Sequence, residues 1–214
     1  MSKSIAVMGI GRFGKKVAVG LSELGVDVMA VDGNREILES ISNVVTYAIQ
    51  ADLTNADAIK GLGLEGMDAV VVAMGEDMTA SIMCIMVAKE VGVPYVIAKA
   101  AEERRGIILK KVGADKVIFP EEETGLKVAR LLASDNFVEL FDIDDNLCIL
   151  EMRPKKEWVG KNMIDLDLRG KYGINVVAVK DENEKRSFID PRRPIEADTY
   201  LLVVAEKSDL DKLK

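Results

Sequence analysis

Short apolar runs alternate with longer helical patterns over residues 1–134, and this alternation limits the possible folds more than any other feature. Most runs are continuously apolar, which is typical of strands buried on both faces of a parallel sheet. Strands are predicted at 4–8, 27–31, 46–50, 69–73, 95–98 and 116–119, and helices at 15–24, 35–42, 78–91 and 103–112. Gly25, Gly92 and Gly113 each follow a predicted helix, where a left-handed glycine commonly ends it. The pattern predicts an α/β fold with a doubly wound parallel sheet.

The pattern changes beyond residue 132, where a polar stretch at 133–136 interrupts the last helix. Strands are predicted at 137–142, 147–152, 175–180, 186–189 and 200–204, with one helix at 163–171. Pro191 and Pro194 fall in the loop before the last strand, where a missing N–H is harmless. We therefore expect two domains, one at residues 1–134 and a small α+β domain at 138–214.

A glycine-rich turn, GIGRFG at residues 9–14, lies between the first predicted strand and the first helix. Gly9 permits a tight turn, Gly11 lets a phosphate approach the backbone, and Gly14 allows close helix–strand packing. The free N–H groups at the helix start favour an anion. Asp32 ends the second strand, where a carboxylate accepts hydrogen bonds from ribose hydroxyls and repels a 2′-phosphate. The sequence thus predicts a Rossmann-like domain that binds an adenine nucleotide other than NADP, the alternative being an empty fold with a glycine turn.

Residues 9–15 also fit the GxxxxGK pattern of a Walker A loop. A P-loop requires Ser or Thr at the next position as a magnesium ligand, and this chain has Lys16, so we reject that interpretation. Ligands of open α/β sheets bind at the carboxyl edge, and further residues follow the strands there. Besides Asp32 and the three glycines, the predicted nucleotide contacts are Arg12, Phe13, Asn34, Arg35, Asp52, Thr54, Ala73, Met74, Gly75 and Lys99.

The composition excludes several classes of function. The chain has no histidine, which excludes Ser-His-Asp and Cys-His catalysis and HExxH zinc sites. The two cysteines, Cys84 and Cys148, form no CxxC pair. With 29 basic and 36 acidic residues the net charge is −7, which argues against a nucleic-acid partner. The chain opens without a secretory pattern and has no apolar run near the roughly 18 residues that a membrane span needs, so we expect a cytoplasmic protein.

Three patterns resemble functional motifs but are better explained by structure. Tyr95 and Lys99 have the spacing of a catalytic Tyr-x-x-x-Lys pair, yet Pro94 and the residues between them predict a strand. The acidic segment 142–146 begins like a calcium loop but has Leu147 where glycine is required, which predicts a solvated turn. The methionine-rich helix predicted at 78–91 is interpreted as core, or as a subunit interface if its outer face is exposed.

Linked motifs in order resemble the RCK (regulator of potassium conductance) family of KtrA/TrkA type. They are AVMGIGRFG at 6–14, AVD at 30–32, KA at 99–100, VGAD at 112–115 and FPE at 119–121, and the resemblance spans the whole chain. It implies that an N-terminal lobe binds ATP or ADP, or in some members NAD(H), as a regulatory ligand rather than a cosubstrate. It further implies that Arg12 reaches the terminal phosphate bound in a neighbouring subunit. Glu121 corresponds to a residue at a cation site, for Mg²⁺ or another cation; acidic residues at a helix start are otherwise ordinary.

The resemblance also covers a second ligand and the assembly. Members of KtrA type bind cyclic di-AMP in the C-terminal lobe through an Arg and an Asn six residues later, which Arg169 and Asn175 match, and Pro194 matches a proline of that pocket. The alternative is an exposed Arg and an Asn that starts a strand. The resemblance implies a homo-oligomer of paired N-terminal lobes in an octameric ring, associated with a membrane-embedded potassium pore of KtrB/TrkH type.

The predicted function is a non-enzymatic cytoplasmic subunit that gates potassium uptake. An NAD-dependent oxidoreductase that uses the same pocket is the main alternative. A nucleotide sensor for another transporter would share every predicted site.

Overall fold

The computed structural model describes residues 3–133, 136–181 and 185–213. The chain divides into two compact units, one up to residue 121 and one from residue 122 onward. Among the described residues, no helix is both long enough and apolar enough to cross a bilayer.

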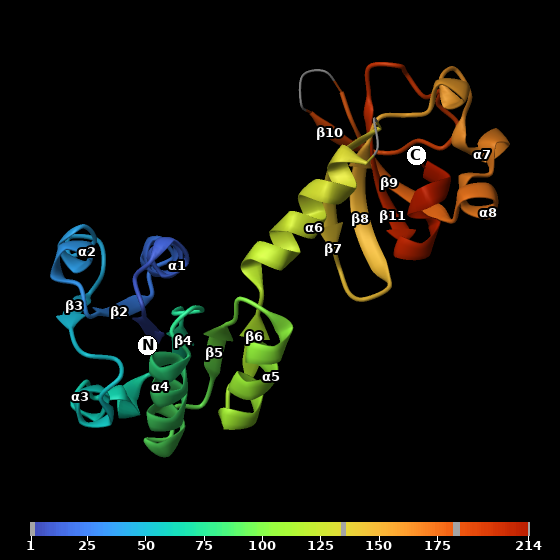
Figure 1. Cartoon of the computed structure of the whole chain (residues 1–214). Helices are drawn as coiled ribbons and strands as arrows, with labels where there is room; N and C mark the ends of the chain where they lie inside the picture. Colours follow the sequence, from blue (N-terminus) through green and yellow to red (C-terminus); the bar gives the residue numbers. More distant parts are fainter. Residues whose placement is uncertain (1–2, 134–135, 182–184, 214) are drawn as a thin grey trace. The chain divides into compact units, whose positions relative to one another are not determined.

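The first unit is a six-stranded parallel sheet in the order β3-β2-β1-β4-β5-β6 (Figure 1). Its strands are β1 (Ser4–Met8), β2 (Asp27–Asp32), β3 (Tyr47–Gln50), β4 (Ala69–Val72), β5 (Val96–Lys99) and β6 (Lys116–Ile118). Its helices are α1 (Arg12–Glu23), α2 (Arg35–Glu39), α3 (Ala56–Lys60), α4 (Met78–Glu90) and α5 (Glu103–Val112), with a 3₁₀ turn at Leu64–Gly66. The strand order reverses between β1 and β4, so the predicted doubly wound sheet is confirmed.

Both faces of this sheet are covered, which explains its continuously apolar strands. Ala6 and Met8 of β1 pack in a core on the side of α3, α4 and α5. Val7 points to the opposite face and packs with residues of α1 and α2. Figure 1 shows these two helix layers on opposite sides of the sheet. Successive side chains of β1 alternate between two buried faces of the sheet. A polar residue in place of Ala6, Val7 or Met8 would therefore lower the stability of the fold.

The predicted elements of this unit are all present; β1 and α5 have the predicted ends, and the others have at least one shifted end. Helix α1 starts at Arg12 rather than at residue 15, because Gly11 already serves as its N-cap. Sequence reasoning missed the short helix α3, although Asn55 caps it by accepting hydrogen bonds from the N–H groups of Asp57 and Ala58. Gly25, Gly92 and Gly113 all have positive φ, as expected for residues that end helices.

The second unit contains a five-stranded antiparallel sheet in the order β10-β9-β11-β8-β7. Its strands are β7 (Phe137–Asp142), β8 (Leu147–Met152), β9 (Ile174–Lys180), β10 (Arg186–Phe188) and β11 (Tyr200–Glu206). Its helices are α7 (Met163–Leu166) and α8 (Leu168–Tyr172), with 3₁₀ segments at Lys156–Trp158 and Lys207–Leu213. Helix α6 (Pro120–Leu132) begins at the end of the first unit and continues into the second.

The single helix predicted at 163–171 is wrong, because Asp167 divides it. Asp167 has φ 47° and ψ 53°, a left-handed conformation that ends α7. Its side chain then accepts a hydrogen bond from the Gly170 N–H at 3.1 Å and caps α8. The short helices place Leu166 and Leu168 in one core with the fully buried Trp158.

Candidate functional site

The glycine turn has the shape that its spacing predicts. Gly9 has φ +88°, and a Cβ atom there would lie 2.3 Å from the Met74 Cγ. A Cβ at Gly14 would lie 1.9 Å from the Gly9 carbonyl oxygen, so helix α1 can approach the turn only with glycine at this position. A Cβ at Gly11 would meet no atom within 4 Å. Gly9 is therefore required by its left-handed φ and Gly14 by packing, whereas Gly11 borders open space.

The start of α1 has no acidic side chain to offset its positive end. Its N-cap is Gly11, which makes no side-chain hydrogen bond, and its first turn contains no acidic residue. The first backbone N–H groups of a helix have no partner within it. This helix start can therefore accept an anion, as expected for a phosphate site.

Asp32 fixes the turn as well as facing the adjacent cavity. Its Oδ2 accepts a hydrogen bond from the Ile10 N–H at 2.7 Å, and its Oδ1 accepts one from the Asn34 N–H at 2.8 Å. Each carboxylate oxygen keeps a second lone pair for a ligand hydroxyl. The Asn34 side chain caps α2 through the Glu36 N–H, and Arg35 forms an exposed ion pair with Glu39. Asn34 and Arg35 are thus occupied with α2 and are not among the residues that line the cavity.

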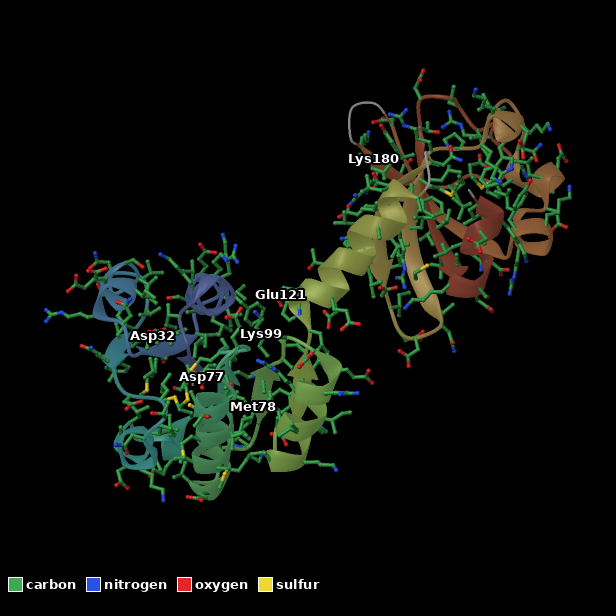
Figure 2. The ribbon with its side chains drawn as sticks, viewed as in Figure 1. Asp32, Asp77, Met78, Lys99, Glu121 and Lys180 are labelled. Atoms are coloured by element: carbon green, nitrogen blue, oxygen red, sulfur yellow. The ribbon has the colours of Figure 1, made fainter. Side chains whose placement is uncertain are left out.

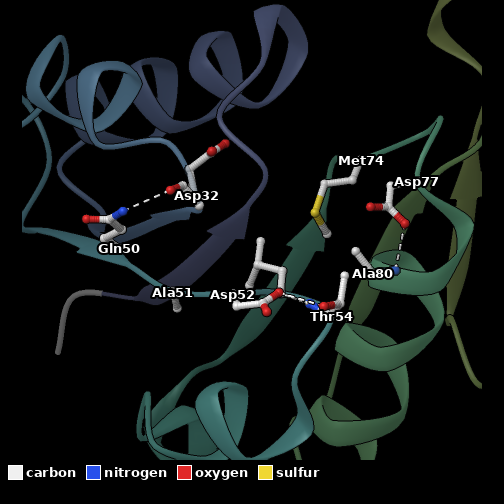
Figure 3. Close-up of a pocket in the computed structure, with 10 residues that line it drawn as sticks. Asp32, Gln50, Ala51, Asp52, Thr54, Met74, Asp77 and Ala80 are labelled. Atoms are coloured by element: carbon white, nitrogen blue, oxygen red, sulfur yellow. Dashed lines mark hydrogen bonds between the residues drawn. The ribbon is translucent and has the colours of Figure 1, made fainter.

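A cavity of about 680 Å³ opens at the carboxyl ends of β2, β3 and β4 (Figure 3). This is a typical size for a small-molecule site. Four of its lining residues belong to the predicted set: Asp32, Asp52, Thr54 and Met74. The lining also includes Gly33, Gln50, Ala51, Leu53, Asp77 and Ala80, which sequence reasoning did not select.

Three carboxylates make this cavity acidic. The Asp52 Oδ1 accepts hydrogen bonds from the Thr54 hydroxyl at 2.6 Å and from its N–H at 2.9 Å, which lower the pKa of Asp52 below its ordinary value. Asp77 caps α4 by accepting from the Ala80 N–H at 2.9 Å. No Lys or Arg is among the described residues that line the cavity. The cavity therefore suits the hydroxyl and amino donors of a nucleoside, and phosphates are favoured at the glycine turn instead.

Asp77 could have been found from the sequence. An Asp directly before a long helical pattern is a common N-cap signal. The helix that Asp77 caps belongs to the core on one side, where Ile85 is fully buried and Met78, Ile82 and Met83 pack against the same cluster. Its Met86 is 43% exposed, so the alternative of a subunit interface stays a prediction.

At the carboxyl edge of β5, Lys99 pairs with Glu121 at 2.6 Å, and Figure 2 shows the two side chains together. The Lys99 ammonium also lies 5.8 Å from the centroid of the Phe13 ring in the glycine turn. The hydrogen bond from Lys99 is the main cause that lowers the pKa of Glu121, and the positive charge of Arg12 adds to it. Three predicted residues, Phe13, Lys99 and Glu121, thus lie together beside the turn, although Lys99 and Glu121 are predicted for different ligands.

Two other predicted residues, Ala73 and Gly75, pack against the glycine turn and Lys99 at the carboxyl edge of the sheet. The Ala73 Cβ would lie 3.2 Å from a Cβ at Gly14, and the Gly75 backbone passes close to the Lys99 side chain. Sequence reasoning missed Arg105, which donates hydrogen bonds to the carbonyl oxygens of Gly75 and Glu76 at 3.2 and 3.0 Å. Arg105 therefore holds the loop after β4 in place.

The predicted cation site at Glu121 gains no further ligands in the structure. Within the described ranges, no group of three or more acidic or cysteine side chains is arranged to hold a metal ion. Glu121 is instead bound to an ammonium group. Its role as a metal ligand stays a prediction.

The second unit has a cavity of about 310 Å³ that brings together Arg169 and Asn175. Met163, Ile164 and Pro191 add an apolar side to it. Pro194, predicted for the same pocket, instead lines another cavity and pairs with Asn162 in an isolated bridge. The structure thus joins two of the three predicted residues, with Pro191 as the proline beside them.

Two of the motifs set aside from the sequence, the Tyr95–Lys99 pair and the acidic segment 142–146, have structural explanations. Tyr95 immediately precedes β5 and Lys99 ends it, so the two do not share a helical face. The acidic segment forms a turn in which the Asp144 Oδ1 accepts hydrogen bonds from the N–H groups of Asn146 and Leu147. Asp142 is paired with Arg130 and Lys207.

Comparison with known proteins gives full-length matches. Residues 5–120 match the TrkA-N domain family, and residues 149–214 match the TrkA-C domain family. The chain is 32% identical over 216 residues to Ktr system potassium uptake protein C of Bacillus subtilis, covering 100% of this chain and 97% of that protein. It is 33% identical over 213 residues to Ktr system potassium uptake protein A of Vibrio alginolyticus, covering 99% and 97%.

Solved structures share the fold at lower identity. The GsuK RCK domain matches with a TM-score of 0.66 and 18% identity, over 100% of this chain and 47% of that one. The GsuK channel bound to NAD gives 0.66 and 17%, over 98% and 38%. GsuK bound to ADP gives 0.54 and 16%, over 64% and 36%. This chain therefore spans less than half of the GsuK chains that it matches.

Proposed function

Because the chain belongs to the family of proteins that combine a TrkA-N and a TrkA-C domain, we propose that it is a nucleotide-sensing regulatory subunit of a potassium uptake system. Its match to Ktr potassium uptake proteins extends over the whole chain, at 32–33% identity to the two proteins compared. The observation that carries the proposal is the acidic cavity of about 680 Å³ beside a helix start that no side chain caps. A nucleoside and its phosphates need these two features side by side.

The proposed ligand is ATP or ADP, with NAD(H) as the alternative. The nucleoside occupies the cavity, where Asp32 and Asp52 accept hydrogen bonds from ribose hydroxyls or from the adenine amino group. The phosphates lie at Gly11, against the first turn of α1. GsuK, which shares the fold, binds both NAD and ADP, which supports this class of ligand. Cyclic di-AMP at Arg169 and Asn175 is proposed as a second ligand.

The proposed partner is a membrane-embedded potassium pore of KtrB/TrkH type. Copies of this chain form a ring, which we expect to be octameric, on the cytoplasmic side of that pore. Arg12, in the first turn of α1, extends from one copy to the terminal phosphate bound in the next. The identity of the bound nucleotide then changes the contact between paired subunits, and the ring transmits this change to the pore.

Calorimetric titration and solution scattering test this function with the purified full-length chain. We expect saturable binding of both ATP and ADP, with a different scattering profile for each complex. Potassium flux through the co-purified pore in liposomes should then differ between the two nucleotides. Identical profiles and identical fluxes would contradict the gating mechanism. Turnover of NADH with any partner substrate would instead support an oxidoreductase.

A further inference from the structure

The loop between β4 and α4, residues 73–77, forms one wall of the cavity beside the glycine turn. Met74 and Asp77, the second and the last residue of this loop, both line the cavity (Figure 3). Each residue of the loop is half-buried or exposed, so core packing does not fix its conformation. The conformation of the loop therefore depends on the hydrogen bonds that its backbone makes.

Four carbonyl groups of this loop, those of residues 74–77, accept hydrogen bonds from two side chains. The hydroxyl of Ser81, which is 1% exposed in α4, lies 2.8 and 2.7 Å from the carbonyl oxygens of Met74 and Asp77. Arg105 in α5 donates from Nη1 to the carbonyl oxygens of the two residues between them, at 3.2 and 3.0 Å. Ser81 thus fixes the two ends of this segment, and Arg105 fixes its middle.

A second contact orients Arg105 itself. Its Nε pairs with the carboxylate of Glu102, the N-cap residue of α5, at 3.3 Å, and its side chain is 36% exposed. The guanidinium is planar and rigid, so the contact at Nε sets the direction in which Nη1 points. Without Arg105, water can reach the two carbonyl groups at this partly exposed place, which keeps the cost in stability small. The loop would then be free to move, and a nucleotide would have to order it on binding.

Resting on the proposed nucleotide function, we propose that Arg105 is a positioning residue, which fixes the β4–α4 loop so that Met74 and Asp77 are in place before the nucleoside binds. Arg105 is not among the described residues that line the cavity, so it acts through the loop rather than on the ligand. The loop borders the cavity proposed for the nucleoside, whereas the phosphates are expected at the start of α1. The contribution of Arg105 to affinity is therefore the same for ligands with and without phosphates.

Calorimetric titration of ATP, ADP and adenosine into variants of the full chain tests this role. Arg105→Met should weaken the binding of all three ligands by about tenfold, which corresponds to the ordering of about one loop residue on binding. Arg104→Met removes the same charge from the neighbouring, exposed position of α5 and is the matched control, which should bind like the wild type. Thermal unfolding of ligand-free Arg105→Met checks its folding, and Arg105→Gln serves as a second variant without the guanidinium.

A double-mutant cycle shows whether Arg105 acts through the loop. Asp77→Asn removes the charge that the loop places in the cavity but keeps a cap for α4. In the Asp77→Asn background, Arg105→Met should therefore weaken ATP binding by less than about threefold, since the two substitutions remove the same contact. Hydrogen exchange adds a measurement without ligand. The amide hydrogens of Ala80 and Ser81, which bond to Asp77, should exchange faster in Arg105→Met than in Arg104→Met.

Four results would overturn the role of Arg105. A larger loss for ATP than for ADP would mean that its charge acts on the phosphates, and an equal loss in Arg104→Met would mean that any charge on α5 has this effect. A loss that persists in full with Asp77→Asn, or hydrogen exchange that Arg105→Met leaves unchanged, would show that Arg105 does not position the loop. A wild-type chain that binds none of the three ligands refutes the proposed function instead, while the exchange measurement still tests the contact between Arg105 and the loop.

Discussion

Each of the three acidic side chains that line the cavity accepts a hydrogen bond from a backbone N–H group and so stabilises a turn or a helix start, besides its proposed contact with a ligand. Asp32 joins the glycine turn to β2, Asp52 closes the turn after β3, and Asp77 caps α4. These hydrogen bonds hold the carboxylates in position before a nucleotide arrives, which lowers the entropy lost on binding. A substitution at any of the three therefore changes stability and affinity together, and the two effects must be separated by the choice of variant.

Asp77 allows this separation, because asparagine caps helices about as well as aspartate. We expect Asp77→Asn to keep the unfolding free energy within a few tenths of a kcal/mol, whereas Asp77→Ala loses about 1 kcal/mol with the cap. Both variants should weaken nucleotide binding if the charge itself attracts ligand donors. Chemical denaturation and calorimetric titration measure the two quantities. Wild-type affinity in Asp77→Asn would show that Asp77 serves only as a cap.

Asp115 provides a prediction for the dependence of stability on pH. Hydrogen bonds from Lys89 and from the Val96 N–H lower the pKa of Asp115 in the folded chain. A carboxyl whose pKa is lower when folded stabilises the fold above its unfolded pKa, near 3.9, and that contribution is lost as the pH falls through the folded value. We expect Asp115→Asn to lower the midpoint of thermal unfolding at pH 7. This difference in midpoint between the variant and the wild type should disappear when the pH falls below the pKa of Asp115 in the folded chain. A difference in midpoint that does not change with pH would contradict this assignment. Lys89→Met, which removes the partner of Asp115, should lower the midpoint by a similar amount at pH 7.

At the scale of elements, hydrophobic pattern and glycine position predict most of the first unit. Strands such as β1 are recognisable because both of their faces are buried, and Gly25 ends its helix with φ +78°. The break at Asp167 was missed because the apolar pattern continues through it, although aspartate is a preferred N-cap and is enriched at positive φ among residues other than glycine. Arg105 was missed because its partners, the carbonyl groups of Gly75 and Glu76, are 30 and 29 residues away in the sequence. Local patterns predict elements, whereas such contacts depend on the folded chain.

Two glycines in helices, one beside open space and one against a packed side chain, test whether the contacts of the folded chain decide the effect of a substitution. A Cβ at Gly20 in α1 would meet no atom within 4 Å, so Gly20→Ala should stabilise the chain by about 0.5–1 kcal/mol through helix propensity. A Cβ at Gly106 in α5 would lie 2.5 Å from the Phe119 Cζ, so Gly106→Ala should destabilise it by about 1–3 kcal/mol. Urea unfolding of both variants gives the comparison. Stabilisation by both would mean that Phe119 moves aside without cost.

At the scale of the whole molecule, sequence reasoning predicted the architecture better than the site. Four of the predicted residues line the cavity, but Asp77, one of its three carboxylates, comes from another strand–helix loop and was not predicted. The meeting of Lys99 with Glu121 depends on the pairing of β5 with β6, a property of the sheet rather than of either segment. The predicted domain limits at 134 and 138 stay predictions, and the compact units of the structure divide after residue 121.

The two units have separate cores, which leads to a prediction for unfolding. Residues such as Val7 and Met8 form the cores of the first unit, and Trp158 and Leu150 belong to that of the second. A ligand stabilises only the unit that it binds, by about 2.7 kcal/mol at one hundred times its dissociation constant. In a calorimetric scan of the full chain we expect two transitions.

ATP should raise the unfolding temperature of the first unit only, and cyclic di-AMP that of the second unit only. Asp32→Ala should abolish the shift caused by ATP, and Arg169→Ala the shift caused by cyclic di-AMP. Arg169 is exposed in the short helix α8, so its replacement should leave the ligand-free second transition nearly unchanged. A single transition raised by either ligand would instead mean that the units unfold together, because binding at one site would then stabilise both cores.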